Sequence, residues 1–242
     1  MTEQKNALQA LQDLEVEELA VYADDVSIQG TIAQFLTLGL KQGQAIWCSR
    51  GSLLAYNDKV NWQLKVPGGA GKAVSRLMAG EGLSLTYVTA DGPGAKVVLT
   101  NNAPGRLLTW DLDRGPITCT SGSFVAALGD VNIDVTIARK AGAAFFGGAG
   151  LFLQKLSGHG IAVVHGSGDF HLVELEAGEK LLVSTGNLAV FSSTMEYDIR
   201  GVGGCLKAVF GGEGLFMTEL TGPGWVVLQS LKRVPIAAKA GR

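Results

Sequence analysis

The sequence has 242 residues, of which 34 are glycine, and only 17% of its residues are charged. The glycine share is about twice the usual value of roughly 7%, and the low charge excludes a disordered chain, which needs high charge and low hydrophobicity. The net charge of −2 gives no general attraction to nucleic acid, and glycine without a three-residue period excludes collagen.

The first 18 residues are predicted to form a helix or a flexible segment. Leu8, Leu11 and Leu14 follow helical spacing, so residues 3–15 are expected to form a short amphipathic helix. No basic region precedes an apolar run, and we expect no secretion signal. Residues 19–28, LAVYADDVSI, are predicted to form a β-hairpin that turns at Asp24-Asp25, within a closing hairpin at 16–31.

Three segments of the chain then repeat one pattern of glycines and strands. The segments begin at Leu38, Trp110 and Val173. In each segment a second glycine is followed eleven residues later by a large residue: Gly51 by Trp62, Gly122 by Ile133, and Gly186 by Tyr197. The pattern predicts three similar units at approximately residues 26–94, 95–160 and 161–224.

Each segment contains a predicted strand in which apolar and polar residues alternate, starting at Val60, Val131 or Met195. Such alternation places one face on a core and the other in water. Further along each segment, a Gly-x-Gly sequence that begins at Gly92, Gly158 or Gly222 lies between two apolar runs. We expect a hairpin at each, because glycine adopts the positive φ of tight turns; the last would be a closing hairpin at 215–230.

Several sequence blocks resemble a known family. They are Gly51-Ser52-Leu53-Leu54-Ala55, GEGLS from Gly80, GEGLF from Gly212, and the ending TGPGWVVLQS. Over about residues 19–231 the chain resembles the altered inheritance of mitochondria protein 24 family, a bacterial and mitochondrial domain of unknown function. The resemblance implies an all-β fold with double-sheet lobes, similar to the tryptophan RNA-binding attenuator protein, and implies no enzyme activity.

We therefore predict an all-β fold with little helix, as a single unit over residues 19–231. It would consist of three pseudo-threefold-related β-repeats of double-stranded β-helix or β-sandwich type. Residues 232–242 contain four basic residues and are expected to form a flexible tail.

Two features that could indicate catalysis or nucleotide binding have simpler explanations. The glycine-rich loop Val66–Val74 contains Lys72, but Val66 and Ala73 replace residues that a phosphate-binding loop requires, so we interpret it as an inter-strand loop. Acidic residues alternate in two places, and we interpret both as solvated strand faces. These residues are Glu174, Glu176 and Glu179, together with Asp111 and Asp113.

The three histidines, His159, His165 and His171, lie within 13 residues. Imidazoles are common metal ligands, and His165 and His171 flank a Gly-Ser-Gly-Asp turn. No cysteine or carboxylate completes a ligand set by its spacing, so we interpret all three as ordinary strand and turn residues.

The cysteines Cys48, Cys119 and Cys205 form no C-x-x-C pair and are expected to be reduced thiols of a cytoplasmic protein. Cys48, Cys119 and Val183 each precede a repeated glycine by three residues, which is typical of a small core position.

The basic residues do not recur at matched positions. Lys65 and Arg200 correspond, but the second segment has Thr136 or Ile137 there. Binding of nucleic acid therefore depends on the analogy with the attenuator fold alone.

No catalytic, cofactor-binding or metal-binding residue is predicted. The sequence favours a non-enzymatic, cytoplasmic scaffold or binding protein that self-associates into a homo-oligomer, because few charges leave apolar surface to cover. RNA or single-stranded nucleic-acid binding is one alternative, and a small-molecule or metal-binding β-barrel is another. No transmembrane segment is expected, because no apolar run reaches 18 residues.

Overall fold

The computed structural model describes residues 16–67, 84–138, 151–201 and 216–233. Within these ranges the chain forms strands β1 to β17, a helical stretch at 16–20, and two 3-10 turns, η1 (Leu112–Arg114) and η2 (Thr185–Asn187). The predicted all-β fold with little helix is confirmed. The predicted helix at residues 3–15 lies outside the described residues.

We call the first group of strands lobe 1. Its strands are β2 (Phe35–Leu40), β3 (Ala45–Cys48), β4 (Leu53–Tyr56), β5 (Val60–Lys65), β6 (Leu85–Ala90) and β7 (Ala95–Leu99). β7 lies between β2 and β4, and β6 lies between β3 and β5, so the lobe has two antiparallel sheets. β1 (Asp25–Gln29) extends the first sheet by pairing with β2.

Lobe 3 has the same order of strand partners. Its strands are β12 (Phe170–Leu175), β13 (Lys180–Ser184), β14 (Leu188–Ser192), β15 (Glu196–Gly201), β16 (Phe216–Thr221) and β17 (Gly224–Gln229). β17 lies between β12 and β14, and β16 lies between β13 and β15.

Lobe 2 uses two long strands, each of which belongs to both sheets. Its strands are β8 (Gly105–Asp111), β9 (Ile117–Thr120), β10 (Phe124–Ala138) and β11 (Leu151–Ser167). The second part of β11 lies between β8 and the start of β10, and its first part lies between β9 and the end of β10. The same order of partners therefore occurs in all three lobes and supports the threefold repeat, which stays a prediction.

A register shift occurs at the same place in each lobe. It separates Leu53 from Ala55 in β4, Phe124 from Ala126 in β10, and Leu188 from Val190 in β14. Below, residues of different lobes are called equivalent when they occupy the same position in strands that have the same order of partners. In this sense Ala55, Ala126 and Val190 are equivalent, and so are Cys48, Cys119 and Val183.

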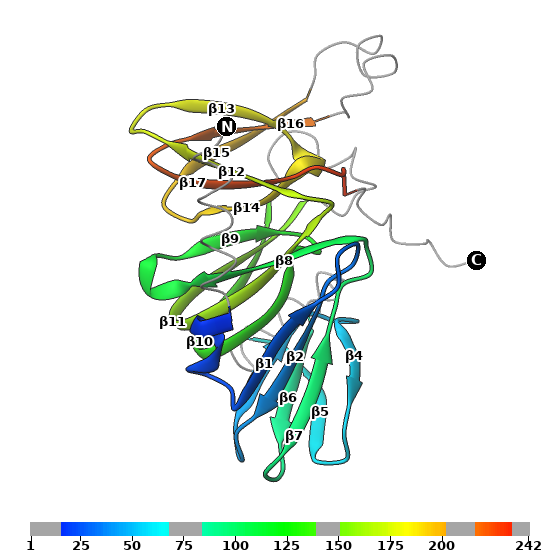
Figure 1. The fold of residues 1–242 in the computed structure, drawn as a ribbon. Helices are drawn as coiled ribbons and strands as arrows, with labels where there is room; N and C mark the ends of the chain where they lie inside the picture. The colour runs from blue at the N-terminus through cyan, green and yellow to red at the C-terminus, as the bar shows by residue number, and fades with distance from the viewer. Residues whose placement is uncertain (1–15, 68–83, 139–150, 202–215, 234–242) are drawn as a thin grey trace, which may run out of the picture.

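Two strand pairs join the lobes to one another. β3 of lobe 1 pairs with β10 of lobe 2, and β9 of lobe 2 pairs with β14 of lobe 3. One large sheet consequently runs in the order β12-β17-β14-β9-β11-β10-β3-β6-β5, with β8 beside β11. Lobe 2 lies in the middle of Figure 1, lobe 3 above it and lobe 1 below it.

The hairpins predicted at the Gly-x-Gly sequences are wrong. β6 and β7 do not pair with each other, and neither do β16 and β17. The sequences at Gly92 and Gly222 are corners where the chain passes from one sheet of a lobe to the other, and Gly158–Gly160 lies inside β11. Two apolar runs that flank a glycine are compatible with a corner as well as with a hairpin, because this sequence pattern does not determine which strand each run pairs with.

The closing hairpin predicted at 16–31 is also wrong. Residues 16–20 are helical, and Leu19 from this stretch is buried in the core of lobe 1. β1 pairs with β2 rather than with residues before it. A short helical stretch with one buried leucine therefore takes the place of the predicted first strand.

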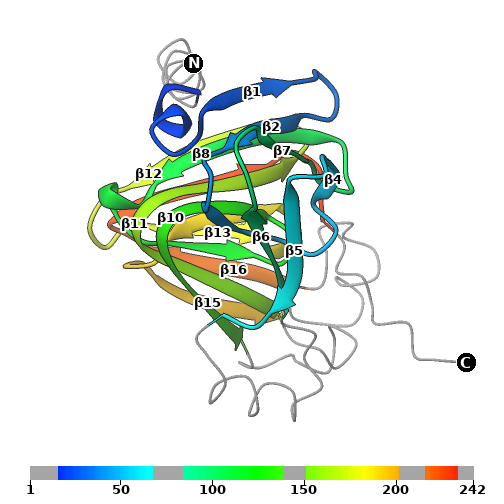
Figure 2. The same ribbon diagram turned by 90° about the horizontal axis from the view of Figure 1, so that it is seen from below.

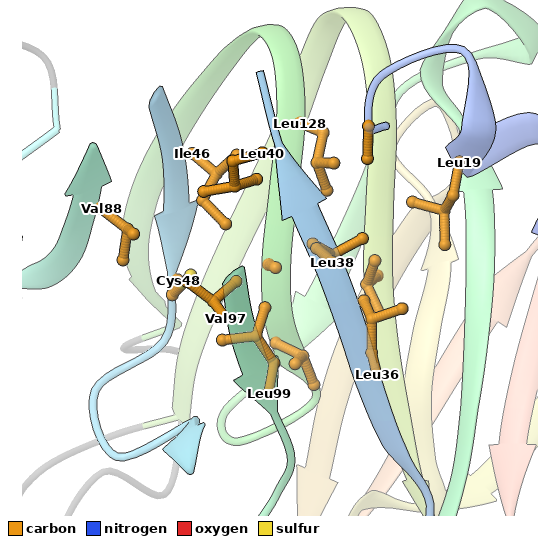
Figure 3. Packing of buried hydrophobic residues seen from close by; sticks show 14 of the residues in the cluster. Leu19, Leu36, Leu38, Leu40, Ile46, Cys48, Val88, Val97, Leu99 and Leu128 are labelled. Carbon is orange, nitrogen blue, oxygen red and sulfur yellow. The ribbon is translucent and has the colours of Figure 1, made fainter. Parts of the chain in front are cut away.

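Hydrophobic clusters fill the space between the two sheets of each lobe. The first cluster combines Leu36, Leu38, Val97 and Leu99 of lobe 1 with Leu128 of lobe 2 (Figure 3). The other large clusters belong mainly to lobe 2 and lobe 3. In the view from below in Figure 2, β1, β2 and β7 lie at the top, and β5 and β6 run at a steep angle below them.

The predicted unit ends too early at residue 231. The backbone N–H of Arg233 donates to the carbonyl of Gly186 at 2.8 Å, and its side chain reaches inward to Ser123. The packed part of the chain therefore extends at least to Arg233, and the predicted flexible tail at 232–242 is wrong for this residue.

Candidate functional site

Large apolar side chains are exposed on β4 and β5, at the end of lobe 1. Leu54, Tyr56 and Leu64 have exposed fractions of 59%, 51% and 51%. The equivalent residues of the other lobes have exposed fractions of at most 8%. They are Val125, Ala127 and Val135 in lobe 2, and Ala189, Phe191 and Ile199 in lobe 3. These positions are therefore core positions in two lobes and surface positions in lobe 1.

The aromatic residues at this end border the core rather than the outer surface. Tyr56 pairs with Val97, and Trp62 pairs with Val88; both valines are fully buried. Since opposed residues of a strand pair point to the same face, both rings lie on the core face of their sheets. The indole N–H of Trp62 donates to the hydroxyl oxygen of Tyr56 at 3.1 Å, which joins the two sheets across the open end of the lobe.

A second exposed apolar position lies on β13 of lobe 3, at the other end of the molecule. Leu182 is 54% exposed, whereas its equivalents are the half-buried Trp47 and the buried Thr118. Within the described residues β13 pairs only with β16, and β4 pairs only with β7. Each end thus combines an apolar side chain with an open strand edge, a combination that favours pairing with another strand.

The three histidines lie in different surroundings. Nδ1 of the exposed His159 lies 2.5 Å from Oδ1 of Asp113, and this hydrogen bond, helped by the negative charge, raises the pKa of His159. His165 is buried, and His171 is exposed on β12. Among the described residues, no three His, Cys, Asp or Glu side chains gather as a metal site would require.

His165 belongs to a buried polar network at the centre of the molecule. The guanidinium of Arg233 donates to Nδ1 of His165 at 3.0 Å and to the Ser123 hydroxyl at 2.5 Å, and a third contact reaches the Ser167 hydroxyl at 3.3 Å. Because Nδ1 accepts, the ring proton of the neutral imidazole is on Nε2. Burial and the charge of Arg233 lower the pKa of His165 to about 4, against an opposing hydrogen bond with the backbone of Ala103.

This network connects lobes 2 and 3 through the end of the chain. Arg233 itself has its pKa lowered to about 10 by burial, and no carboxylate among the described residues pairs with it. Its guanidinium is held by hydroxyls, the His165 ring and backbone carbonyls instead. We interpret the network as a structural clamp, because the Arg233 guanidinium contacts Ser123, Ser167 and Nδ1 of His165. Nε2 of His165 is buried and makes no hydrogen bond of normal geometry within the described residues.

Cys48 and Cys119 are free thiols and fully buried, and Val183 is buried too, so the predicted core position is confirmed. Burial raises the pKa of both thiols far above its usual range, which leaves them un-ionised and poor nucleophiles. Cys205 and residues 68–74 of the glycine-rich loop, Lys72 included, lie outside the described residues.

The matched basic residues contact their own lobes. The ammonium of Lys65 lies 3.7 Å from the centre of the Tyr87 ring, and Arg200 makes two contacts of 3.0 Å with the carboxylate of Glu219. Thr136 is exposed at the equivalent position in lobe 2, and the side chain of Ile137 is not among those that the structure describes.

The acidic residues have local partners in turns. Glu174 is exposed on β12, but Glu176 and Glu179 lie in the turn after it, where Glu179 accepts from the N–H of Glu176. The strand-face interpretation is therefore wrong for these two, and also for Asp113, which lies in η1. Asp111 accepts from the N–H of Asp113 at the start of η1.

The fold and these surfaces define an all-β protein of three joined double-sheet lobes with open apolar edges. The chain belongs to the family described as mitochondrial biogenesis AIM24, whose model matches residues 26–231, and the resemblance seen in the sequence is confirmed. It is similar to an uncharacterised protein of Streptococcus pyogenes serotype M6, with 27% identity over 202 residues that cover 80% of each chain.

A crystal structure of a Streptococcus pyogenes protein has the same fold. It superposes with a TM-score of 0.72 at 22% sequence identity, over 86% of this chain and 94% of that one. In the described part of our chain, no helix has the length and apolar character to cross a membrane.

Sequence reasoning missed the exposed positions Leu54, Tyr56, Leu64 and Leu182. Their apolar character fits the core of a lobe, and the sequence does not reveal that the strands carrying them are edges. The alignment of the three segments places Tyr56 opposite Ala127 and the large, buried Phe191, so residue size alone gives no signal of exposure.

Proposed function

We propose that this chain is a non-enzymatic scaffold protein of the cytoplasm that acts through self-association. The observation that carries the proposal is the exposure of Leu54, Tyr56 and Leu64, at positions that are buried in both other lobes. Large apolar groups left in water at such positions favour a partner that covers them. The un-ionised, buried thiols of Cys48 and Cys119 support a protein without thiol chemistry in a reducing compartment.

We favour a scaffold over nucleic-acid binding because the matched basic residues, Lys65 and Arg200, are occupied by Tyr87 and Glu219. We favour it over a metal-binding barrel because His159 and His165 have separate partners, Asp113 and Arg233.

Sedimentation velocity over a range from low to high micromolar concentration tests the proposal. We expect a mass above that of one chain, 25.2 kDa, which increases with concentration or is already a multiple at the lowest concentration. A single species with the mass of one chain at the highest concentration would contradict self-association.

A further inference from the structure

The two junctions between lobes have the same register. At the first, Ala126 lies opposite Cys48, and Ala127 opposite Trp47. At the second, Val190 lies opposite Cys119, and Phe191 opposite Thr118. In both junctions, the residue equivalent to Ala55 therefore lies opposite the residue equivalent to Val183. The residue equivalent to Tyr56 lies opposite the residue equivalent to Leu182.

One strand of each kind has no junction partner among the described residues. β4 is equivalent to the start of β10 and to β14, and β13 is equivalent to β3 and β9. Both are edge strands, β4 of the sheet β1-β2-β7-β4 and β13 of the sheet β13-β16-β15. β13 lies at the top of Figure 1 and β4 in the lower lobe, and the two strands belong to separate sheets, so they do not pair with each other within one chain.

Near each of the two edges, side chains are more exposed than their equivalents in other lobes. On the β4 side, Tyr56 and Leu64 are half-exposed, although their equivalents are buried in both other lobes.

On the β13 side, Leu182 is exposed, and Met217 on the neighbouring strand is only partly buried. The equivalents of Met217, Leu85 and Leu153, are buried, and Leu153 packs against Ile199 of the next lobe. Ile199 is the equivalent of Leu64.

We propose that β4 of one molecule pairs antiparallel with β13 of a second molecule and forms a third junction of the same kind. Ala55 then lies opposite Val183, and Tyr56 lies opposite Leu182. This inference rests on the proposed self-association and assigns its surface. Leu64 covers Met217 in the assembly, as Ile199 covers Leu153 within the chain.

The charges near the two edges fit this register. At the second junction the N–H of Ser193 donates to the carbonyl of Pro116 at 2.9 Å. The equivalent residues across the new junction are Asp58 and Lys180, which carry opposite charges, although Lys180 also contacts Glu219 of its own lobe at 3.1 Å. The contact joins two different surfaces, so the molecules associate head to tail, and each retains a free edge for the next until a ring closes.

Complementary edge variants test the head-to-tail contact. Tyr56→Lys removes the β4 surface and leaves β13 intact, whereas Leu182→Lys does the reverse. We expect each variant alone to sediment as a monomer with the circular dichroism spectrum of the wild type. An equimolar mixture has one intact pair of edges and is expected to form a heterodimer and nothing larger. Ile32→Lys changes an exposed apolar residue away from both edges and is expected to keep the wild-type mass.

The other outcomes separate this inference from the proposed function. If the wild type is a monomer, self-association and the third junction fail together. If the wild type is an oligomer that both variants retain, the third junction alone is wrong. Loss of association by one variant only would indicate a symmetric contact and would also overturn the head-to-tail arrangement.

A disulfide experiment tests the register without depending on a loss of binding. Tyr56→Cys and Leu182→Cys are combined in a Cys205→Ser background and oxidised. Opposed residues of an antiparallel pair have Cα atoms about 4.5–5.5 Å apart, which suits a disulfide. We expect a ladder of linked chains on a non-reducing gel. Absence of the ladder, or an equal ladder from an Ile32→Cys and Leu182→Cys control, would overturn the register.

Discussion

The apolar core and the guanidinium of Arg233 keep the His165 imidazole in its neutral form. Both disfavour a second proton on the ring, which explains the pKa of about 4. The contact joins residues 68 positions apart. The sequence placed His165 near a turn but gave no signal for Arg233, because a side-chain partner so far along the chain depends on the complete fold.

Lowering the pH is expected to remove the stability that neutral His165 contributes. The pKa in the folded protein lies below the unfolded value of 6.5, so the unfolded chain binds more protons between about pH 6.5 and 4. The contribution is present above pH 6.5 and decreases as the pH falls to 4, by up to about 3 kcal/mol. Urea unfolding should show the stability gap between wild type and His165→Asn shrinking between pH 7 and 4.5. The exposed His171→Asn variant should follow the wild type, and a constant gap would contradict the assignment.

Replacing Arg233 by methionine should destabilise the fold by about 1–3 kcal/mol, because Ser123 and His165 lose a buried donor. Chemical denaturation at pH 7 measures the change. Arg50→Met, at an exposed position, should stay within about 0.5 kcal/mol of the wild type. An Arg233→Met protein as stable as the wild type would show that removing an unpaired buried charge outweighs the lost hydrogen bonds.

The long strands of lobe 2 depend on glycines where their backbones come close together. A Cβ at Gly160 would lie 2.1 Å from the carbonyl oxygen of Leu128, and one at Gly158 would lie 2.3 Å from that of Asp130. The sequence identified these glycines and the positive φ of Gly158, but it assigned them to a tight turn. Alternation of apolar residues predicts that a strand exists, whereas its partner depends on backbone contacts that no local pattern encodes.

Gly160→Ala is therefore expected to unfold lobe 2 or to lower its stability by several kcal/mol. The matched control is Gly115→Ala, where φ is also positive and no atom lies within 4 Å of the added Cβ. That control carries only the conformational cost, about 1 kcal/mol. Thermal unfolding of both variants measures the difference. Equal effects would show that the backbone at Gly160 moves to accommodate a methyl group.

At the scale of the whole molecule, the sequence predicted the fold class, which is confirmed, whereas the predicted self-association stays a prediction, and the sequence did not indicate which surface would carry it. Composition and alternation depend on each strand alone, so they indicate sheets and apolar faces. Which faces stay uncovered depends on the order in which lobes join, and this order leaves β4 and β13 as edges.

Self-association through these edges should make the melting temperature depend on protein concentration. A hundredfold increase in concentration stabilises an associated state by about 2.7 kcal/mol, which corresponds to roughly 5–10 °C for a chain of this size. Differential scanning fluorimetry at two concentrations measures the shift. Tyr56→Lys should melt at the same temperature at both concentrations, and a shift as large as that of the wild type would contradict the edge assignment.

The buried thiols have a practical consequence for studies of folding. Cys48 belongs to the first hydrophobic cluster and Cys119 to the second, so each is shielded by a different part of the core. In a Cys205→Ser background, the rate at which each thiol reacts with a labelling reagent reports how often its own cluster opens. Equal rates would mean that the lobes open as one cooperative body, whereas unequal rates would rank the lobes by local stability without any introduced probe.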